Sequence, residues 1–296
     1  MSISAPIPAY LRTSYPFESR WLPLERGRMH YVDTGGGGPV VLLLHGNPTW
    51  SFLWRDLIRS LSLQGYRCIA PDHLGMGYSD KPDHFFRLAD RIAHVESLLD
   101  VLGVSHCHLC VHDWGGAIGF GMALRQPERI GRLVVTNTAA FLPPPGARLP
   151  WRIAACRLPV LGELIVRGLN GFVLPATYMA VSRHLSRTVR AGYLAPYGSW
   201  GSRGAIARFV SDIPMEHDHP SHAMLEEMDA TLGKLSAHPI LLAWGGRDFC
   251  FNDAYFAEWA RRFPNAILRY RPSAGHYVLE DAGDFLIPEI RDFLDA

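Results

Sequence analysis

The chain has 296 residues, of which 48% are hydrophobic and 19% are charged, and its formal net charge is +1. This composition is typical of a globular protein with enough apolar residues for a large core. The near-neutral charge gives no indication of a nucleic-acid partner, and no segment approaches the roughly 18 consecutive apolar residues of a membrane span.

The first ten residues and the cysteines indicate a cellular compartment. Residues 1–10 lack the basic and apolar regions of a secretory signal. The five cysteines are odd in number and do not have the spacing of a small disulfide-stabilised domain. They are Cys68, Cys107, Cys110, Cys156 and Cys250. We therefore predict free thiols and a cytoplasmic location.

Strand and helix patterns alternate along most of the chain. Two short strands, Trp21–Glu25 and Arg28–Asp33, are predicted to form a hairpin around Gly27. Further strands are predicted at 39–44, 66–72, 106–113, 130–137, 239–246 and 266–271, and helices at 51–63, 87–102, 117–125, 254–263 and 285–294. This alternation predicts an α/β fold with a mostly parallel central sheet and helices on both faces.

Residues 141–220 interrupt the alternation. This block has few strand signals, opens with "FLPPPG" and contains nine arginines against four acidic residues. We predict that it is a helical cap inserted into a core made of residues 1–140 and 221–296. A separate domain is the alternative, but it is less favoured because strands resume after residue 220 and complete the same alternation.

Polar residues follow four of the predicted strands, and parallel strands place their carboxyl ends at one edge of a sheet. Asn47 lies in "HGNP", Asp113 and Trp114 lie in "HDWGG", Asp248 follows "LLAWGG", and His276 follows the last strand. The chain order of Asp113, Asp248 and His276 is that of nucleophile, acid and base in the α/β-hydrolase fold, with aspartate in place of the usual serine.

Asp113 is therefore the predicted nucleophile. Taken alone, an aspartate between strand and helix is more often a helix N-cap, but the other polar groups favour catalysis. A carboxylate nucleophile forms an alkyl ester or an acyl anhydride. His276 would activate a water molecule against an ester, with Asp248 orienting the imidazole. Asp253 is a rival to Asp248, but its place at a helix start suits a cap.

Trp114 and Asn47 supply uncharged donors beside Asp113. An indole N–H and an amide NH₂ can together hold a departing anion, either a halide or a carboxylate oxygen. Their backbone N–H groups are predicted to form an oxyanion hole. The alternatives are core packing for Trp114 and turn formation before Pro48 for Asn47.

The motifs "HGNPTWSFLWR", "PDHLGMGYSDKP", "VHDWGGAIG", "WGGRDF" and "GHYVLED" together resemble those of the haloalkane dehalogenases. The resemblance implies that Asp113 is the nucleophile and that Trp114 and Asn47 are the halide donors. In some subfamilies the acid matches Asp248, and in others it is a Glu at the position of Asn137. Epoxide hydrolases share this type of elbow and use two cap tyrosines, for which Tyr178, Tyr193 and Tyr197 are candidates.

The cap phrases "VRGLNGF" and "GYLAPYGSW", with "FVSDIPM" after them, resemble the dehalogenase-like β-lactone decarboxylases of bacterial long-chain olefin biosynthesis. This resemblance covers nearly the whole chain and implies conversion of a cis-3,4-dialkyl β-lactone to a cis-alkene and carbon dioxide. It implies the same core residues and no cofactor. Two routes for the reaction stay open, in which Asp113 attacks either the β-carbon or the carbonyl carbon of the lactone. Haloalkane hydrolysis is the second candidate and epoxide hydrolysis the third.

The predicted ligand is a hydrophobic small molecule with long alkyl chains, and other olefin-pathway enzymes are candidate partners. The apolar, arginine-containing stretch 151–174 is predicted to pack on the core, with docking to a membrane or partner as the alternative. Two His-rich stretches, 106–112 and 216–222, are interpreted as a strand and a solvated loop rather than as metal sites.

Overall fold

The computed structural model describes residues 7–296. Residues 1–6 belong to the N-terminal segment that was predicted not to be a secretory signal, and they lie outside the described residues. An eight-stranded sheet has the order β1-β2-β4-β3-β5-β6-β7-β8. β2 pairs antiparallel with β1 and β4, and all other neighbours are parallel, which confirms the predicted fold class. The strands are β1 (Arg20–Leu24), β2 (Gly27–Asp33), β3 (Val40–Leu44), β4 (Arg67–Pro71), β5 (Cys107–His112), β6 (Ile130–Thr136), β7 (Ile240–Gly245) and β8 (Ile267–Arg271).

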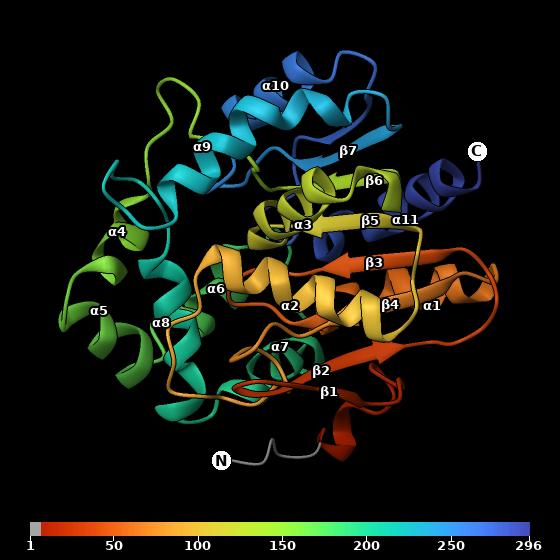
Figure 1. The fold of residues 1–296 in the computed structure, drawn as a ribbon. Helices are drawn as coiled ribbons and strands as arrows, with labels where there is room; N and C mark the ends of the chain where they lie inside the picture. The colour runs from red at the N-terminus through yellow and green to blue at the C-terminus, as the bar shows by residue number, and fades with distance from the viewer. Residues whose placement is uncertain (1–6) are drawn as a thin grey trace.

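Helices cover both faces of this sheet (Figure 1). α2 and α3 lie on the near face and α1 and α11 on the far one, while α9 packs against α3. The bounds are α1 (Arg55–Leu63), α2 (Leu88–Val101), α3 (Trp114–Arg125), α9 (His222–Thr231), α10 (Asp253–Arg262) and α11 (Val278–Asp295). Short 3-10 helices are η1 (Ala9–Leu11), η2 (Ser51–Trp54), η3 (Pro127–Arg129) and η7 (Leu232–Leu235).

Two helices begin earlier than predicted. α3 starts at Trp114 rather than at residue 117, directly after Asp113. α11 starts at Val278 rather than at residue 285, and non-helical backbone at Ala282 interrupts it. The periodicity of the later turns was visible in the sequence, whereas the glycine-rich first turn of α3 carries little hydrophobic pattern.

Between β6 and β7 the chain forms a group of short helices beside one edge of the sheet (Figure 1). They are α4 (Trp151–Arg157), α5 (Leu161–Glu163), the π-helix η4 (Leu164–Gly168), α6 (Val173–Met179), α7 (Arg187–Leu194), η5 (Ala195–Tyr197), η6 (Gly201–Arg203) and α8 (Gly204–Ser211). Division of the chain into a cap at 141–220 and a core stays a prediction. Within residues 7–296, no helix has both the length and the apolar character needed to cross a bilayer.

The central strands hold the core together. β3 and β5 are apolar on both faces because helices cover each side, and Leu42, Leu44 and Leu109 are fully buried. The carboxyl ends of β3 and β5 are therefore held in place by the packed core. The turns that leave β3, β5, β7 and β8 carry the polar residues predicted from the sequence.

Candidate active site

Asp113 occupies a sharp turn between β5 and α3. Its backbone has φ 50° and ψ −126°, a conformation that non-glycine residues rarely adopt. A Cβ atom on Gly115 would lie 2.0 Å from the carbonyl oxygen of Leu44, and one on Gly116 would lie 1.9 Å from Oγ1 of Thr138. The two glycines are therefore required for the turn. The Asp113 side chain makes no N-cap hydrogen bond, so the structure does not support the capping alternative.

The Asp113 carboxylate is held by backbone donors. The Asn47 N–H donates to its Oδ1 at 2.7 Å, and the Trp114 backbone N–H also donates to the carboxylate. These are the two N–H groups that the sequence predicted as an oxyanion hole. In the resting protein they bind the nucleophile itself. An oxyanion formed from Oδ1 when an Asp113 ester is attacked would keep the same two donors.

His276 and Asp248 form the remainder of the predicted triad. Nδ1 of His276 lies 2.7 Å from Oδ2 of Asp248, and Nε2 lies 3.7 Å from Oδ2 of Asp113. Asp248 is fixed by two further donors, the backbone N–H of Cys250 at 2.7 Å and the side-chain amide of Asn137 at 3.0 Å. The Asp113–His276–Asp248 arrangement is thus brought together from three separate turns.

Burial and charge act in opposite directions on this pair. Burial raises the pKa of Asp113, and the charge of His276 and the N–H groups of Asn47 and Trp114 offset this in part. Burial alone would lower the pKa of His276, but the charge and hydrogen bond of Asp248 and the charge of Asp113 raise it above its usual value. The surroundings therefore shift the His276 imidazole toward its protonated form, while burial makes the Asp113 carboxyl group harder to ionise.

The side chains of Asn47 and Trp114 both line the cavity over Asp113. The Asn47 amide donates one hydrogen to the carbonyl of Ile206 on α8, at 3.2 Å, which leaves its second N–H available. The Trp114 indole packs edge-on against Phe209, and its N–H has no hydrogen-bond partner among residues 7–296. Two uncharged donors are therefore available for a departing anion.

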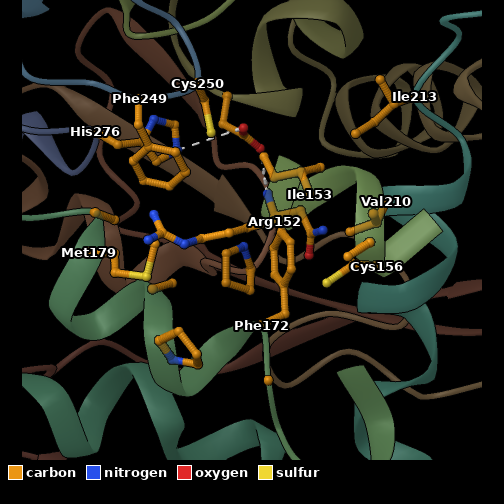
Figure 2. A pocket seen from close by; sticks show the side chains of 18 of the residues that line it. Arg152, Ile153, Cys156, Phe172, Met179, Val210, Ile213, Phe249, Cys250 and His276 are labelled. Atoms are coloured by element: carbon orange, nitrogen blue, oxygen red, sulfur yellow. Dashed lines mark hydrogen bonds and ion pairs between the residues drawn. The ribbon is translucent and has the colours of Figure 1, made fainter. Parts of the chain in front are cut away.

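A cavity of about 370 Å³ lies over these groups, and Figure 2 shows its lining. Its walls are mostly apolar. They include Ile153, Phe172, Met179, Val210 and Ile213, and the guanidinium of Arg152 reaches among them (Figure 2). Apolar walls around a few convergent polar groups are typical of a site for a hydrophobic small molecule.

Three contacts near His276 were not predicted from the sequence. His112 donates through Nε2 to the His276 carbonyl oxygen at 2.9 Å. The Asp281 carboxylate accepts backbone N–H groups from Gly275 at 2.7 Å and from Ser182 and Arg183, which precede α7, at 2.7 and 2.8 Å. The Tyr277 N–H donates to the Ala180 carbonyl at 2.7 Å. These contacts fix the loop that carries His276. His112 lies in the "VHDWGG" motif and Tyr277 and Asp281 lie in "GHYVLED", but the motifs do not indicate which partners these residues bind.

The cap tyrosines proposed for epoxide opening lie elsewhere. Tyr193 donates to Glu280 at 2.5 Å, Tyr197 donates to the Thr49 carbonyl at 3.1 Å, and exposed Tyr178 accepts from Arg190 at 2.5 Å. None of the three belongs to the lining of the cavity over Asp113. The arrangement therefore does not favour an epoxide hydrolase.

The histidines of the two His-rich stretches make local contacts. His108 accepts the Arg132 N–H at 3.0 Å, and His222 pairs through Nδ1 with the Pro214 carbonyl at 3.2 Å. Within residues 7–296, no group of three or more His, Cys, Asp and Glu side chains is arranged to hold a metal ion. All five cysteines are free thiols.

Comparison with known proteins agrees with this geometry. The alpha/beta hydrolase fold family matches residues 39–283. A cis-3-alkyl-4-alkyloxetan-2-one decarboxylase of Shewanella oneidensis is 42% identical over 96% of this chain and 90% of its own. Haloalkane dehalogenase 2 of Mycobacterium tuberculosis is 36% identical over 91% and 92%. The crystal structure of a haloalkane dehalogenase from Bradyrhizobium elkani has a TM-score of 0.83 and 28% identity, covering 94% and 98%. The chain therefore belongs to the α/β-hydrolase fold family and, within it, to the haloalkane dehalogenase-like proteins that include these decarboxylases.

Proposed function

We propose that the protein decarboxylates cis-3,4-dialkyl β-lactones to cis-alkenes and carbon dioxide in long-chain olefin biosynthesis. Asp113 is the covalent nucleophile, His276 and Asp248 tune its charge, and Trp114 and Asn47 hold the leaving oxygen. The observation that carries the proposal is an Asp–His–Asp arrangement beneath an apolar cavity, in a chain 42% identical to a decarboxylase of this name over 96% of its length.

The bonds balance without a co-reactant. Asp113 attacks C4 of the lactone with inversion, the C4–O bond breaks, and the ring oxygen leaves as a carboxylate on C3. The bond between C3 and that carboxylate then breaks, its electrons form the alkene, and the Asp113 ester leaves from C4. Anti elimination after inversion turns a cis lactone into a cis alkene. Attack on the lactone carbonyl, which gives an anhydride, is the competing route.

The charges of the site suit the second step. A departing Asp113 carboxylate would face the imidazolium of His276, whose pKa is raised above its usual value. Its Oδ1 would regain the Asn47 N–H. The leaving carboxylate of the first step would find the free N–H groups of Trp114 and Asn47. Both developing anions therefore meet donors that already stand in place.

Haloalkane hydrolysis is the second candidate, because a dehalogenase 36% identical over 91% of the chain is also a relative. It would use the same nucleophile and halide donors. It differs in needing a water molecule, activated by His276, to release the ester.

A side-by-side assay separates the two candidates. The purified protein is given a long-chain cis-β-lactone and a 1-haloalkane, and alkene and halide are measured. Alkene without halide is expected, and Asp113→Ala is expected to abolish it. Halide without alkene would make the protein a dehalogenase. Trapping and sequencing the Asp113 adduct tests the route, because an anhydride instead of an alkyl ester would refute attack on C4.

The proposal extends to where the protein acts. We place it in the cytoplasm, in a complex with the enzyme that closes the lactone ring. The cap supports such a contact with exposed apolar side chains, among them Trp151, Val160 and Leu169 at 73%, 74% and 77% exposure. Co-elution with the lactone-forming enzyme on size exclusion, lost in a Trp151→Glu/Val160→Glu variant, is the expected result. Separate elution of the two intact proteins would contradict it.

A further inference from the structure

A second cavity also reaches Asp113. It measures about 140 Å³, against about 370 Å³ for the first. Both are lined by five of the same residues, which are Asp113, Trp114, Ile153, Ile213 and Cys250. The nucleophile and its neighbouring donor therefore stand at the junction of two spaces.

The two cavities have different walls. Beyond the shared residues, the first is lined from the cap, with Phe172, Ala176 and Met179 on or beside α6. The second is lined by Ala117 on α3, Leu225 on α9 and Tyr255 on α10, by the segment after β6 that contains Ala139 and Phe141, and by residues 148–150 and 213–215. Ile153 comes from α4 and Ile213 from the loop after α8, and both side chains line both cavities.

Both sets of walls are suited to hydrocarbon. The surface lining the second cavity, like that of the first, is mainly apolar, and the titratable groups that line it besides Asp113 are Arg148, Cys250 and Tyr255. A ligand with one alkyl chain needs only one such space. A ligand with chains on two adjacent carbons, with the reacting C–O bond between the chains and Asp113, needs two spaces that diverge from the nucleophile.

We propose that the two cavities are separate subsites for the two alkyl chains of one substrate, one chain on each side of Asp113. The inference rests on the proposed function for the identity of that substrate, a cis-3,4-dialkyl β-lactone. The cavity volumes make the subsites unequal. The chain bound between α3, α9 and α10 is limited to a shorter length than the chain bound beneath α6.

A matched pair of substitutions tests the assignment. Ala176→Phe fills the first cavity and Ala139→Phe fills the second, and each alanine lines one cavity and not the other. Each variant is assayed with two regioisomeric lactones, one with a long chain on C3 and methyl on C4, the other with the reverse. Phe172→Ala and Leu225→Ala enlarge the two cavities and serve as the opposite pair.

A crossed pattern is expected. Each filling variant loses at least about tenfold in kcat/KM on the regioisomer whose long chain enters the filled cavity, and spares the other regioisomer. Ala176→Phe and Ala139→Phe spare opposite regioisomers, and each enlarging variant accepts a longer chain on its own side. If both filling variants impair the same regioisomer, or both equally, the two-subsite proposal is overturned.

A binding measurement separates this proposal from the decarboxylase proposal. The same substitutions are placed in Asp113→Asn, and the affinity for each regioisomer is measured by calorimetry. A crossed pattern of affinities without alkene formation by the unsubstituted protein would retain the subsites and refute the reaction. Alkene formation without a crossed pattern would retain the reaction and refute the subsites. Thermal unfolding of each variant shows whether it has folded, and the enlarging pair replaces a filling variant that has not.

Discussion

Nε2 of His276 lies 3.7 Å from Oδ2 of Asp113, beyond the length of a hydrogen bond, while its other ring nitrogen is bound to Asp248 at 2.7 Å. The imidazole is therefore oriented toward the nucleophile without being bonded to it. A water molecule activated by His276 is required for hydrolysis of an ester but has no place in the proposed decarboxylation.

This difference predicts an isotope result. During many turnovers of a cis-β-lactone in H₂¹⁸O, the peptide containing Asp113 is expected to remain unlabelled. The Asp113 carboxylate departs from C4 with both of its own oxygen atoms, so no oxygen from water enters it. Hydrolysis of a haloalkane would place ¹⁸O in that carboxylate. Mass spectrometry of the peptide gives the readout, with an incubation without substrate as control. Label that accumulates with lactone turnover would contradict the elimination route.

The pKa of Asp113 sets the acidic limb of the activity. Attack requires the ionised carboxylate, and burial raises the pKa of Asp113 from 3.8. We expect kcat/KM for the lactone to fall as the pH falls through this raised pKa, at a higher pH than for an exposed aspartate. Circular dichroism at each pH controls for unfolding. A rate that stays constant until the fold is lost would show that Asp113 need not be ionised.

Asp113 is also expected to limit stability. A carboxyl group whose folded pKa lies above its unfolded pKa disfavours folding when both states are ionised, and this cost disappears below the unfolded pKa. Asp113→Asn should therefore raise the free energy of unfolding at neutral pH, on the order of 1 kcal/mol, and leave it unchanged below about pH 3.8. Urea unfolding at the two pH values measures this. An equal or lower stability at neutral pH would contradict the prediction.

The carboxylate that orients His276 could also be supplied from position 137, next to Asp248. Oδ2 of Asp248 lies 2.7 Å from His276 and 3.0 Å from the amide of Asn137. Asp248→Asn is expected to lower kcat by about 10²- to 10⁴-fold, because the imidazolium loses its charged partner. Adding Asn137→Asp should recover activity on the order of tenfold. Asn137→Asp in the otherwise unchanged chain is the control, and a double variant no better than Asp248→Asn would contradict the shared role.

Gly46 keeps the nucleophile in place. A Cβ atom there would lie 2.0 Å from Oδ1 of Asp113, so Gly46→Ala must displace the carboxylate. We expect a loss on the order of 100-fold in kcat. Gly233→Ala is the matched control, because a Cβ at this exposed glycine would meet nothing within 4 Å. Equal activity of the two variants would show that the carboxylate need not occupy its observed position.

Local signals made part of this site predictable. The buried strands β3 and β5 lead directly into "HGNP" and "HDWGG". An apolar run predicts the strand, and the motif after it predicts the turn. The sequence alone therefore predicts that Asn47 and Asp113 lie close together. Asp248 and His276 followed from the rule that parallel strands present their carboxyl ends at one edge.

Contacts between distant segments were not predictable. His112 binds the carbonyl of His276, a residue 164 positions later, and strand periodicity gives no indication of such a partner. Ile153 and Ile213 both line the two cavities, and their positions in the sequence give no indication of this shared lining. Tyr193 and Tyr197 were candidates for epoxide opening, and only the structure shows that they hydrogen-bond elsewhere.

The shared carboxylate of Asp281 has a mechanical consequence. It binds the N–H groups of Gly275, Ser182 and Arg183, and a backbone bond joins Tyr277 to Ala180 alongside it. On this side the cap cannot lift without pulling on the loop that carries His276. The stretch 180–183 is therefore tied through this group of hydrogen bonds to the loop that carries His276. A displacement of residues 182 and 183 would therefore be transmitted through the single Asp281 carboxylate to the turn that places His276 beside Asp113.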